Sequence, residues 1–358
     1  MNSHRAHESG YKAHESEPSE TEILMLASAP GKVMLAGEYV VLHGEPCLVA
    51  ACDRRVSIAG TRTVDAGKSA SPNRLPFHPL PEEAQAARRR AEAELGSLDL
   101  EWFACTTPLY RGDQKLGLGS SSACAAAAAA AVHAQHGFEV QLPAVRRDIL
   151  THALEGHREV APRGSGADVA AAVHGGVLRY ARQGEAVELC SEHWPSGLHY
   201  RVIWTGTPVR TSGMVQRIFE CSRQEPAAFD RLFGALRAAA RSFIDAFSRA
   251  APSEVLAATR AHHRAMQNLG EAASIPIVER RLAQVAELAA SCGGAAKPSG
   301  AGGGDIALAL FDNADAAAAF EARCRPSCEQ EDRPSGEGLE ILRTTLGAPG
   351  VLSPCAST

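Results

Sequence analysis

The feature that most constrains this chain is a glycine and serine loop that leads directly into an alanine-rich segment. Gly117, Gly119 and three consecutive serines, Ser120 to Ser122, precede the apolar run 123–132. Glycine lets backbone N–H groups turn toward a ligand, and the first N–H groups of a helix have no partners within it. We therefore predict a helix here whose N-terminus binds an anion such as phosphate.

The same pattern also occurs as an ordinary loop before a capped helix. It lacks the Gly-Lys-[Ser/Thr] ending of the Walker motif and the spacing of the dinucleotide fingerprint. The loop by itself therefore leaves both interpretations open.

Two other segments combine glycine with charged side chains. In the first, Lys32 stands between Pro30-Gly31 and an apolar run that ends in Gly37-Glu38-Tyr39. In the second, four glycines within 300–304 precede an apolar strand, and they permit close approach of a ligand to the backbone. The alternatives are a lysine that protects a sheet edge from aggregation and a flexible glycine linker.

Composition and charge argue against several classes of function. The 358 residues carry 36 basic and 41 acidic side chains, a net charge of −5, with no long basic run. Binding to nucleic acid or to anionic lipid through charge is therefore not expected. The ten cysteines form no Cys-x-x-Cys pair and no secretory signal is visible, so we expect a reduced, cytoplasmic setting. No apolar segment reaches the ~20 residues that cross a membrane.

Hydrophobic periodicity predicts an α+β protein, with a strand-rich first half and a helix-rich second half that returns to strands. A first strand from residue 23 is expected to break at Ala29-Pro30-Gly31, with loops at 60–82 and 326–338. The other expected strands cover residues 33–42, 47–58, 102–107, 200–205, 306–311 and 339–346. The expected helices cover residues 82–95, 123–132, 143–160, 169–174, 214–250, 253–272, 276–292 and 314–324.

Taken in chain order, the three glycine-containing segments resemble the signatures of the GHMP small-molecule kinases. This family includes galactokinase, homoserine kinase, mevalonate kinase and phosphomevalonate kinase, and the resemblance spans roughly residues 24–350. It implies an N-terminal and a C-terminal α/β domain with the active site in the cleft between them. We accordingly expect a disordered leader at 1–22, an ATP-binding domain at 23–195, a second domain at 196–350 and a tail at 351–358.

The resemblance also implies cofactors and site residues. ATP and Mg²⁺ are expected, with Lys32 and Asp168 as catalytic residues and Ser121 as a metal ligand. The expected ATP-binding residues are Lys115, Gly117, Leu118, Gly119, Ser120, Ser121 and Ser122. The expected substrate-binding residues are Arg54, Ser165, Lys297, Ser299, Gly300, Ala301 and Gly302. The alternatives are that Asp168 only caps the helix that follows it and that Arg54 is a surface charge at a strand end.

Within the family, segments 53–56, 115–121, 164–169 and 204–206 are most similar to phosphomevalonate kinases. This similarity implies phosphorylation of 5-phosphomevalonate to 5-diphosphomevalonate. Mevalonate kinases place a magnesium-binding glutamate eleven residues before the aspartate, where this chain has His157, with Glu155 and Glu159 close by. The alternatives are a kinase for mevalonate or another small molecule, and a ligand-sensing protein of this fold that has lost catalysis.

Overall fold

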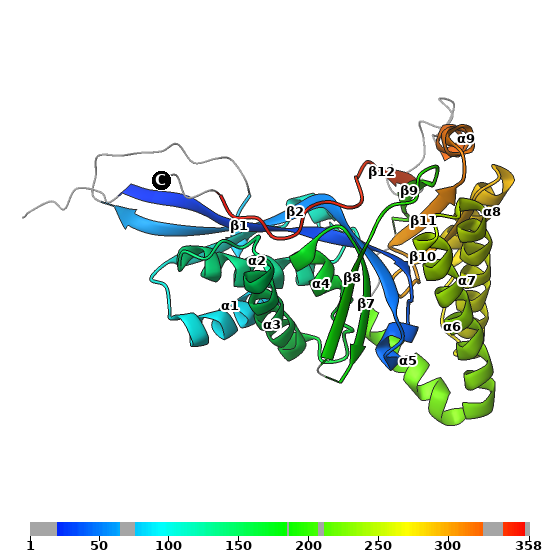
Figure 1. The fold of residues 1–358 in the computed structure, drawn as a ribbon, viewed down its shortest axis with the longest axis horizontal. Helices are drawn as coiled ribbons and strands as arrows, with labels where there is room; N and C mark the ends of the chain where they lie inside the picture. Colours follow the sequence, from blue (N-terminus) through cyan, green and yellow to red (C-terminus); the bar gives the residue numbers. More distant parts are fainter. Residues whose placement is uncertain (1–19, 65–75, 185, 207–210, 325–338, 355–358) are drawn as a thin grey trace, which may run out of the picture.

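The computed structural model describes residues 20–64, 76–184, 186–206, 211–324 and 339–354. Two long strands, β1 (Glu20–Ala36) and β2 (Cys47–Val64), form an antiparallel ribbon that extends toward the C-terminal helices (Figure 1). A short 3₁₀ helix, η1 (Val40–His43), connects them. The predicted break in the first strand is wrong. The strand continues with a shift in register: Pro30 pairs with Arg55 and Lys32 pairs with Ala51, so Gly31 lies at an irregularity in the ladder.

The ribbon belongs to a six-stranded sheet in the order β3-β4-β2-β7-β8, with β1 paired to β2. Its other strands are β3 (His78–Pro79), β4 (Glu101–Cys105), β7 (Val177–Gln183) and β8 (Ala186–Glu192). The sequence patterns did not predict β7 and β8. Most of β8 is exposed, so it lacks the apolar alternation that indicates a strand.

The helices of this half lie along one side of the ribbon (Figure 1). They are α1 (Glu82–Leu95), α2 (Ser120–Gln135), α3 (Pro143–Val160) and α4 (Ala167–His174). Helix α2 contacts the other three, and its side chains from Ser122 to His133 are buried. Alanine suits this position because it favours helix and lets neighbouring helices approach closely. The helix begins at Ser120, so the three serines form its first turn.

Two short segments precede the glycine and serine loop. The 3₁₀ helix η2 (Thr107–Leu109) leads into a small ribbon of β5 (Tyr110–Arg111) and β6 (Gln114–Lys115). The loop therefore runs from the end of a hairpin to the start of a buried helix, and both of its ends are anchored.

The second half has a four-stranded sheet in the order β10-β11-β9-β12, packed against helices. Its strands are β9 (His199–Trp204), β10 (Ala295–Ser299), β11 (Ile306–Phe311) and β12 (Glu340–Leu342). Its helices are α5 (Thr211–Gln224), α6 (Pro226–Ser248), α7 (Pro252–Ala272), α8 (Arg280–Ser291) and α9 (Ala314–Cys324). The single helix predicted over 214–250 is wrong: it divides before Pro226, since proline has no N–H to continue the helical ladder.

The predicted last strand, 339–346, is only three residues long as β12, and the chain then returns to the N-terminal half. The Arg55 guanidinium donates to the carbonyl oxygens of Ser28, Pro349 and Gly350. Ser28 and Leu352 also pair as an isolated bridge. Residues 349–352, which follow the second sheet in the chain, therefore bind to β1 and β2 of the N-terminal half. The predicted leader and the predicted 326–338 loop lie mostly or wholly outside the described residues.

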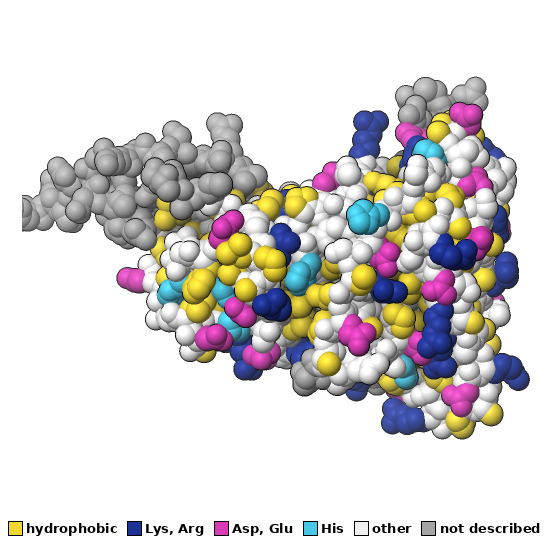
Figure 2. Space-filling model, in the orientation of Figure 1, with side chains coloured by type: hydrophobic (Ala, Val, Ile, Leu, Met, Phe, Trp, Pro, Cys, Tyr) yellow, Lys and Arg dark blue, Asp and Glu magenta, His cyan; other side chains and the backbone are white. Residues whose placement is uncertain are grey.

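On the face shown in Figure 2, basic and acidic side chains are intermixed over the C-terminal helices. Within the described part of the chain, no helix combines the length and the apolar character needed to span a membrane.

Candidate active site

Lys32 lies against the glycine and serine loop. Its backbone N–H donates to the Leu118 carbonyl at 2.8 Å. Its Cγ and Cε atoms are each 3.1 Å from the position that a Cβ on Gly119 would occupy. Gly119 has φ of 77°, a conformation that favours glycine. The missing Cβ therefore lets the lysine side chain pass beside the start of α2.

The first turn of α2 presents polar groups at this point. Ser122 is buried and its hydroxyl donates to the Gly119 carbonyl at 2.8 Å. Ser121 is half-buried, and its Oγ lies 3.4 Å from Nε2 of His157 on α3. Within the described chain, no side chain caps the helix, so its first N–H groups remain available to an anion. These groups and the Lys32 ammonium fit the phosphates of a nucleotide.

Asp168 lies in the first turn of α4 and is half-buried. Its Oδ1 accepts a hydrogen bond from the Val169 N–H at 3.0 Å. The turn before it is held by Tyr180, whose buried hydroxyl donates to the Ser165 carbonyl at 2.7 Å. Burial raises the pKa of Tyr180 to about 12, which keeps this donor protonated.

The charges of both predicted catalytic residues affect the pKa of the buried Cys47 thiol. Burial raises the pKa of Cys47, and the negative charges of Glu38 and Asp168 raise it further, whereas Lys32 lowers it. The two predicted catalytic residues therefore act in opposite directions on the pKa of the same buried group.

The third glycine segment contacts the other two. A Cβ placed on Gly117 would stand 2.6 Å from Cβ of Asp305, so the end of this segment touches the glycine and serine loop. The buried Ser299 hydroxyl accepts a hydrogen bond from the Met34 N–H of β1 at 2.9 Å. Gly302 packs so closely on Ile277 that a Cβ would meet its carbonyl oxygen at 2.2 Å. Three segments that are distant in sequence thus meet at the junction of the two halves.

Lys297 does not face an open site in this structure. Its side chain is fully buried, and its ammonium donates to the Glu38 carboxylate and to the Pro298 carbonyl. Burial lowers the pKa of Lys297, while the Glu38 carboxylate opposes this shift. In this structure Lys297 is bonded to Glu38 and to the Pro298 carbonyl, and its contact with a substrate stays a prediction. Sequence reasoning did not select Glu38, although it stands in the first segment as a carboxylate within an apolar run.

Arg54 and Lys115 lie at the edge of this region. The Arg54 guanidinium donates to the carbonyl oxygens of Pro108 and Arg343, at 3.1 and 3.4 Å. It therefore holds backbone segments together. Lys115 is exposed at the end of β6, two residues before the first glycine of the loop.

The carboxylates near His157 in the sequence form ion pairs with arginines of α1. Glu155 pairs with Arg90, and Glu159 pairs with Arg89 and Arg90, all on the surface of α1. In the described ranges, no cluster of three or more His, Cys, Asp or Glu side chains is arranged to hold a metal ion.

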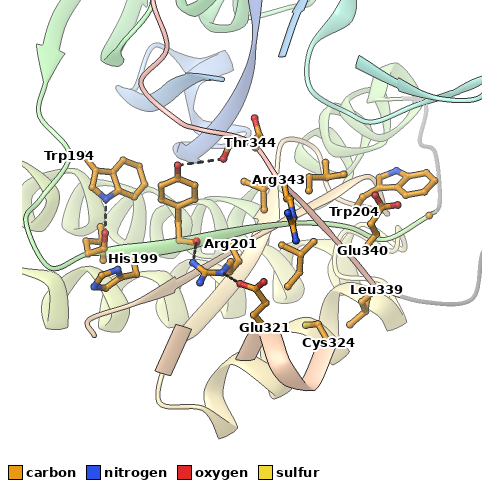
Figure 3. Close-up of a pocket in the computed structure, with 16 residues that line it drawn as sticks. Trp194, His199, Arg201, Trp204, Glu321, Cys324, Leu339, Glu340, Arg343 and Thr344 are labelled. Atoms are coloured by element: carbon orange, nitrogen blue, oxygen red, sulfur yellow. Dashed lines mark hydrogen bonds and ion pairs between the residues drawn. The ribbon is translucent and has the colours of Figure 1, made fainter. Parts of the chain in front are cut away.

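A pocket of about 1090 Å³ lies elsewhere, beside β9 and β12 (Figure 3). Trp194 and Trp204 line it, and Arg201 forms an ion pair with Glu321 at 3.0 Å within it. None of the predicted site residues lines this pocket. We therefore place the candidate active site at the three converging segments.

Two family models and several relatives match this chain. Residues 92–176 match the GHMP kinases N terminal domain, and residues 243–327 match the GHMP kinases C terminal domain. The chain is 27% identical over 336 residues to phosphomevalonate kinase of Streptomyces sp. (strain CL190), covering 79% of this chain and 89% of that protein. It is 29% identical over 308 residues to mevalonate kinase of Aeropyrum pernix, covering 83% of this chain and 91% of that protein.

Solved structures share the fold. Streptococcus pneumoniae phosphomevalonate kinase in complex with phosphomevalonate and AMPPNP matches with a TM-score of 0.70 and 19% identity, covering 90% of this chain and 100% of that one. L. major mevalonate kinase in complex with R-mevalonate matches with a TM-score of 0.64 and 20% identity, covering 97% and 99%. The two matched domains, in this order on a shared fold, show that the chain belongs to the GHMP kinases, a family of ATP-dependent small-molecule kinases.

Proposed function

We propose that this protein transfers the γ-phosphoryl group of ATP to the phosphate of 5-phosphomevalonate, forming 5-diphosphomevalonate and ADP. The observation that carries the proposal is the meeting of Lys32, the glycine and serine loop, and the 299–305 loop at one junction. Phosphoryl transfer requires positioning and charge neutralisation more than covalent chemistry, and this arrangement supplies both.

On the nucleotide side, the first N–H groups of α2 and the glycine backbone bind phosphate oxygens, with Lys115 nearby in solvent. Ser121 is the side chain that would hold Mg²⁺, together with phosphate oxygens. When bound, the metal supplies neutralisation of phosphate charge.

On the acceptor side, an oxygen of the acceptor phosphate forms a new bond to the γ-phosphorus, while the bond to the β-phosphate oxygen breaks and ADP leaves. Lys32 neutralises the charge on the transferring group. An acceptor phosphate has a second pKa of about 6 and is already ionised at neutral pH. Asp168 therefore orients Lys32 and is not required as a strong base.

The acceptor itself needs donors for its anionic groups. Ser165 and the backbone of Gly300, Ala301 and Gly302 are the groups that we assign to this role. Lys297 acts indirectly: its bonds to Glu38 and to the Pro298 carbonyl stabilise the loop that contains Gly300, Ala301 and Gly302.

Two observations favour a phosphorylated acceptor over mevalonate. One is the relative named phosphomevalonate kinase, which aligns over 336 residues. The other is His157, which faces Ser121 where mevalonate kinases are expected to carry a magnesium-binding glutamate. The mevalonate kinase of Aeropyrum pernix, at 29% identity, supports mevalonate as the second candidate.

Turnover on the two acceptors distinguishes these functions. ADP release is measured with 5-phosphomevalonate and with mevalonate, at the same ATP concentration and with Lys32→Ala as the inactive control. We expect kcat/KM to be at least about 100-fold higher for 5-phosphomevalonate, because a site with donors for a phosphate rejects an analogue that lacks it. A preference for mevalonate would contradict the proposal. Nucleotide binding with no turnover on any acceptor would instead indicate a sensor.

A further inference from the structure

We infer that Glu38 and Lys297 are positioning residues, whose buried ion pair holds the 299–304 loop of the C-terminal half against β1, the strand that carries Lys32. The kinetic part of this inference rests on the proposed function. The structural part does not, because it concerns contacts within the free protein.

A single carboxylate joins the two halves at this point. Glu38 follows the end of β1, whereas Lys297 lies in β10. Their side chains are 1% and 0% exposed. Glu38 Oε1 accepts hydrogen bonds from the Lys297 ammonium and, at 3.4 Å, from the Gly300 N–H. The same oxygen therefore contacts both the strand before the loop and the Gly300 amide within the loop.

His262 of α7 completes the surroundings of this carboxylate. Its Nε2 lies 3.2 Å from Glu38 Oε2, and its side chain is fully buried. Burial, with the positive charges of Lys297 and His263, lowers the pKa of His262 well below 6.5, so the ring is neutral at physiological pH. The contact between His262 and Glu38 lacks hydrogen-bond geometry, because Glu38 Oε2 and both ring nitrogens of His262 have no hydrogen-bond partner among the described residues. Lys297 therefore supplies the charge that balances Glu38.

Two further bonds hold neighbouring residues of the same loop. The Met34 N–H donates to the Ser299 hydroxyl at 2.9 Å, and the Tyr39 hydroxyl donates to the Ala301 carbonyl. Residues shortly after Lys32 thus bind successive residues of the loop. A shift of the loop by one residue would break all of these bonds, so the set defines its register relative to Lys32.

The energetics of such a pair indicate the variants to use. A buried ion pair adds little net stability, but removing one partner leaves an uncompensated buried charge. Lys297→Met and Glu38→Gln each leave such a charge. The double variant leaves none. Tyr39→Phe removes one bond to the loop without unbalancing any charge.

Glu45 provides a matched control. Its carboxylate pairs with Arg237 and Arg241 of α6, each at 2.8 Å. These two ion pairs also join the N-terminal half to the C-terminal half. Among the described residues, the side chain of Glu45 bonds to these arginines and not to the 299–304 loop. Glu45→Gln therefore tests the effect of domain contact in general.

Hydrogen exchange of the amides of residues 299–305, measured on the full chain without ligand, tests the structural part. We expect exchange to be at least about 10-fold faster in Lys297→Met and Tyr39→Phe than in the wild type, because the loop opens locally. Glu45→Gln should leave it unchanged. Unchanged exchange in both loop variants, or an equal effect of Glu45→Gln, overturns the inference. If Lys297→Met does not fold, the charge-neutral double variant, which leaves no unpaired buried charge, decides.

Steady-state kinetics test the positioning role. We expect kcat/KM for the acceptor to fall at least about 10-fold in each single charge variant. The KM for ATP should stay within about 2-fold. The charge-neutral double variant should recover thermal stability but not the acceptor kcat/KM, because it also lacks the ion pair. A loss of thermal stability with unchanged acceptor kinetics would show a purely structural pair and overturn the role. If the wild type does not use 5-phosphomevalonate, the proposed function fails, while the exchange experiment still decides the inference.

Discussion

The hydroxyl of Ser121, in the first turn of α2, lies 3.4 Å from Nε2 of His157 on α3. The same imidazole lies near Gly164, since its Cε1 is 3.6 Å from the position of a Cβ on that glycine. His157 therefore connects the glycine and serine loop to the turn that precedes Asp168. An imidazole can donate a hydrogen bond to a hydroxyl or to a phosphate oxygen, which a carboxylate cannot do.

We expect His157→Ala to raise the KM for ATP by roughly 3- to 10-fold, the equivalent of about one hydrogen bond. The KM for the acceptor should change less. His157→Gln retains an N–H donor and should have a smaller effect. Steady-state kinetics with each substrate varied in turn check this expectation, and an ATP dependence identical to wild type in His157→Ala would contradict it.

Lys32→Ala should lower kcat by at least about 100-fold, because one positioned cation that neutralises the transferring group is lost. The fold should remain, since the backbone N–H of residue 32 still donates to Leu118. ADP release and circular dichroism of the same preparation measure the two effects. Near-normal turnover in a folded Lys32→Ala variant would exclude the catalytic role of this residue.

Gly117→Ala should impair both stability and ATP binding. The new Cβ would stand 2.6 Å from Cβ of Asp305, and φ of 74° adds backbone strain. We expect about 1–3 kcal/mol of destabilisation in urea unfolding. Gly112→Ala is the control, because Gly112 has φ of 56° but no atom within 4 Å of a new Cβ. Equal losses in both variants would indicate that contact with Asp305 has no effect.

Tyr180→Phe should loosen the turn that carries Asp168. It removes the donor to the Ser165 carbonyl, which we expect to cost about 0.5–1.5 kcal/mol of unfolding free energy. The kcat should fall about 10-fold, because a small misplacement of the aspartate disturbs Lys32. Unfolding curves and turnover are measured together. A loss of stability without any loss of kcat would restrict Tyr180 to a structural role.

His174 should make stability depend on pH. Burial, with the nearby positive charge of Arg146, lowers the pKa of His174 from 6.5 to about 4. Between these values the unfolded chain binds the proton and the folded chain does not, so stability falls as pH decreases from about 6.5 toward 4. We expect His174→Asn to flatten this part of the profile. Urea unfolding of both proteins at pH 7.5 and 5.5 provides the measurement, and equal changes in the two proteins would contradict the prediction.

Helix patterns were the most predictable part of the fold. The limits of α1, α3, α9 and β11 agree with the sequence patterns. Proline or glycine marks both ends of α1 and the start of α3. The exposed strand β8 had no such pattern, and the division before Pro226 was overlooked within a long apolar periodicity. Local sequence patterns therefore failed to predict a strand that is mostly exposed and a helix end that is set by a single proline.

The sequence alone determined the α+β class, the glycine loop before a helix, and the presence of Lys32 and Asp168 in segments typical of GHMP kinases. These properties depend on local conformation and on residue type. Only the tertiary structure decided which groups meet. It brought His157 to Ser121, placed Asp305 against Gly117, and buried Lys297 on Glu38, 259 residues away. Burial and the pairing of distant charges are set by how the two halves pack, and no local pattern in the chain encodes that packing.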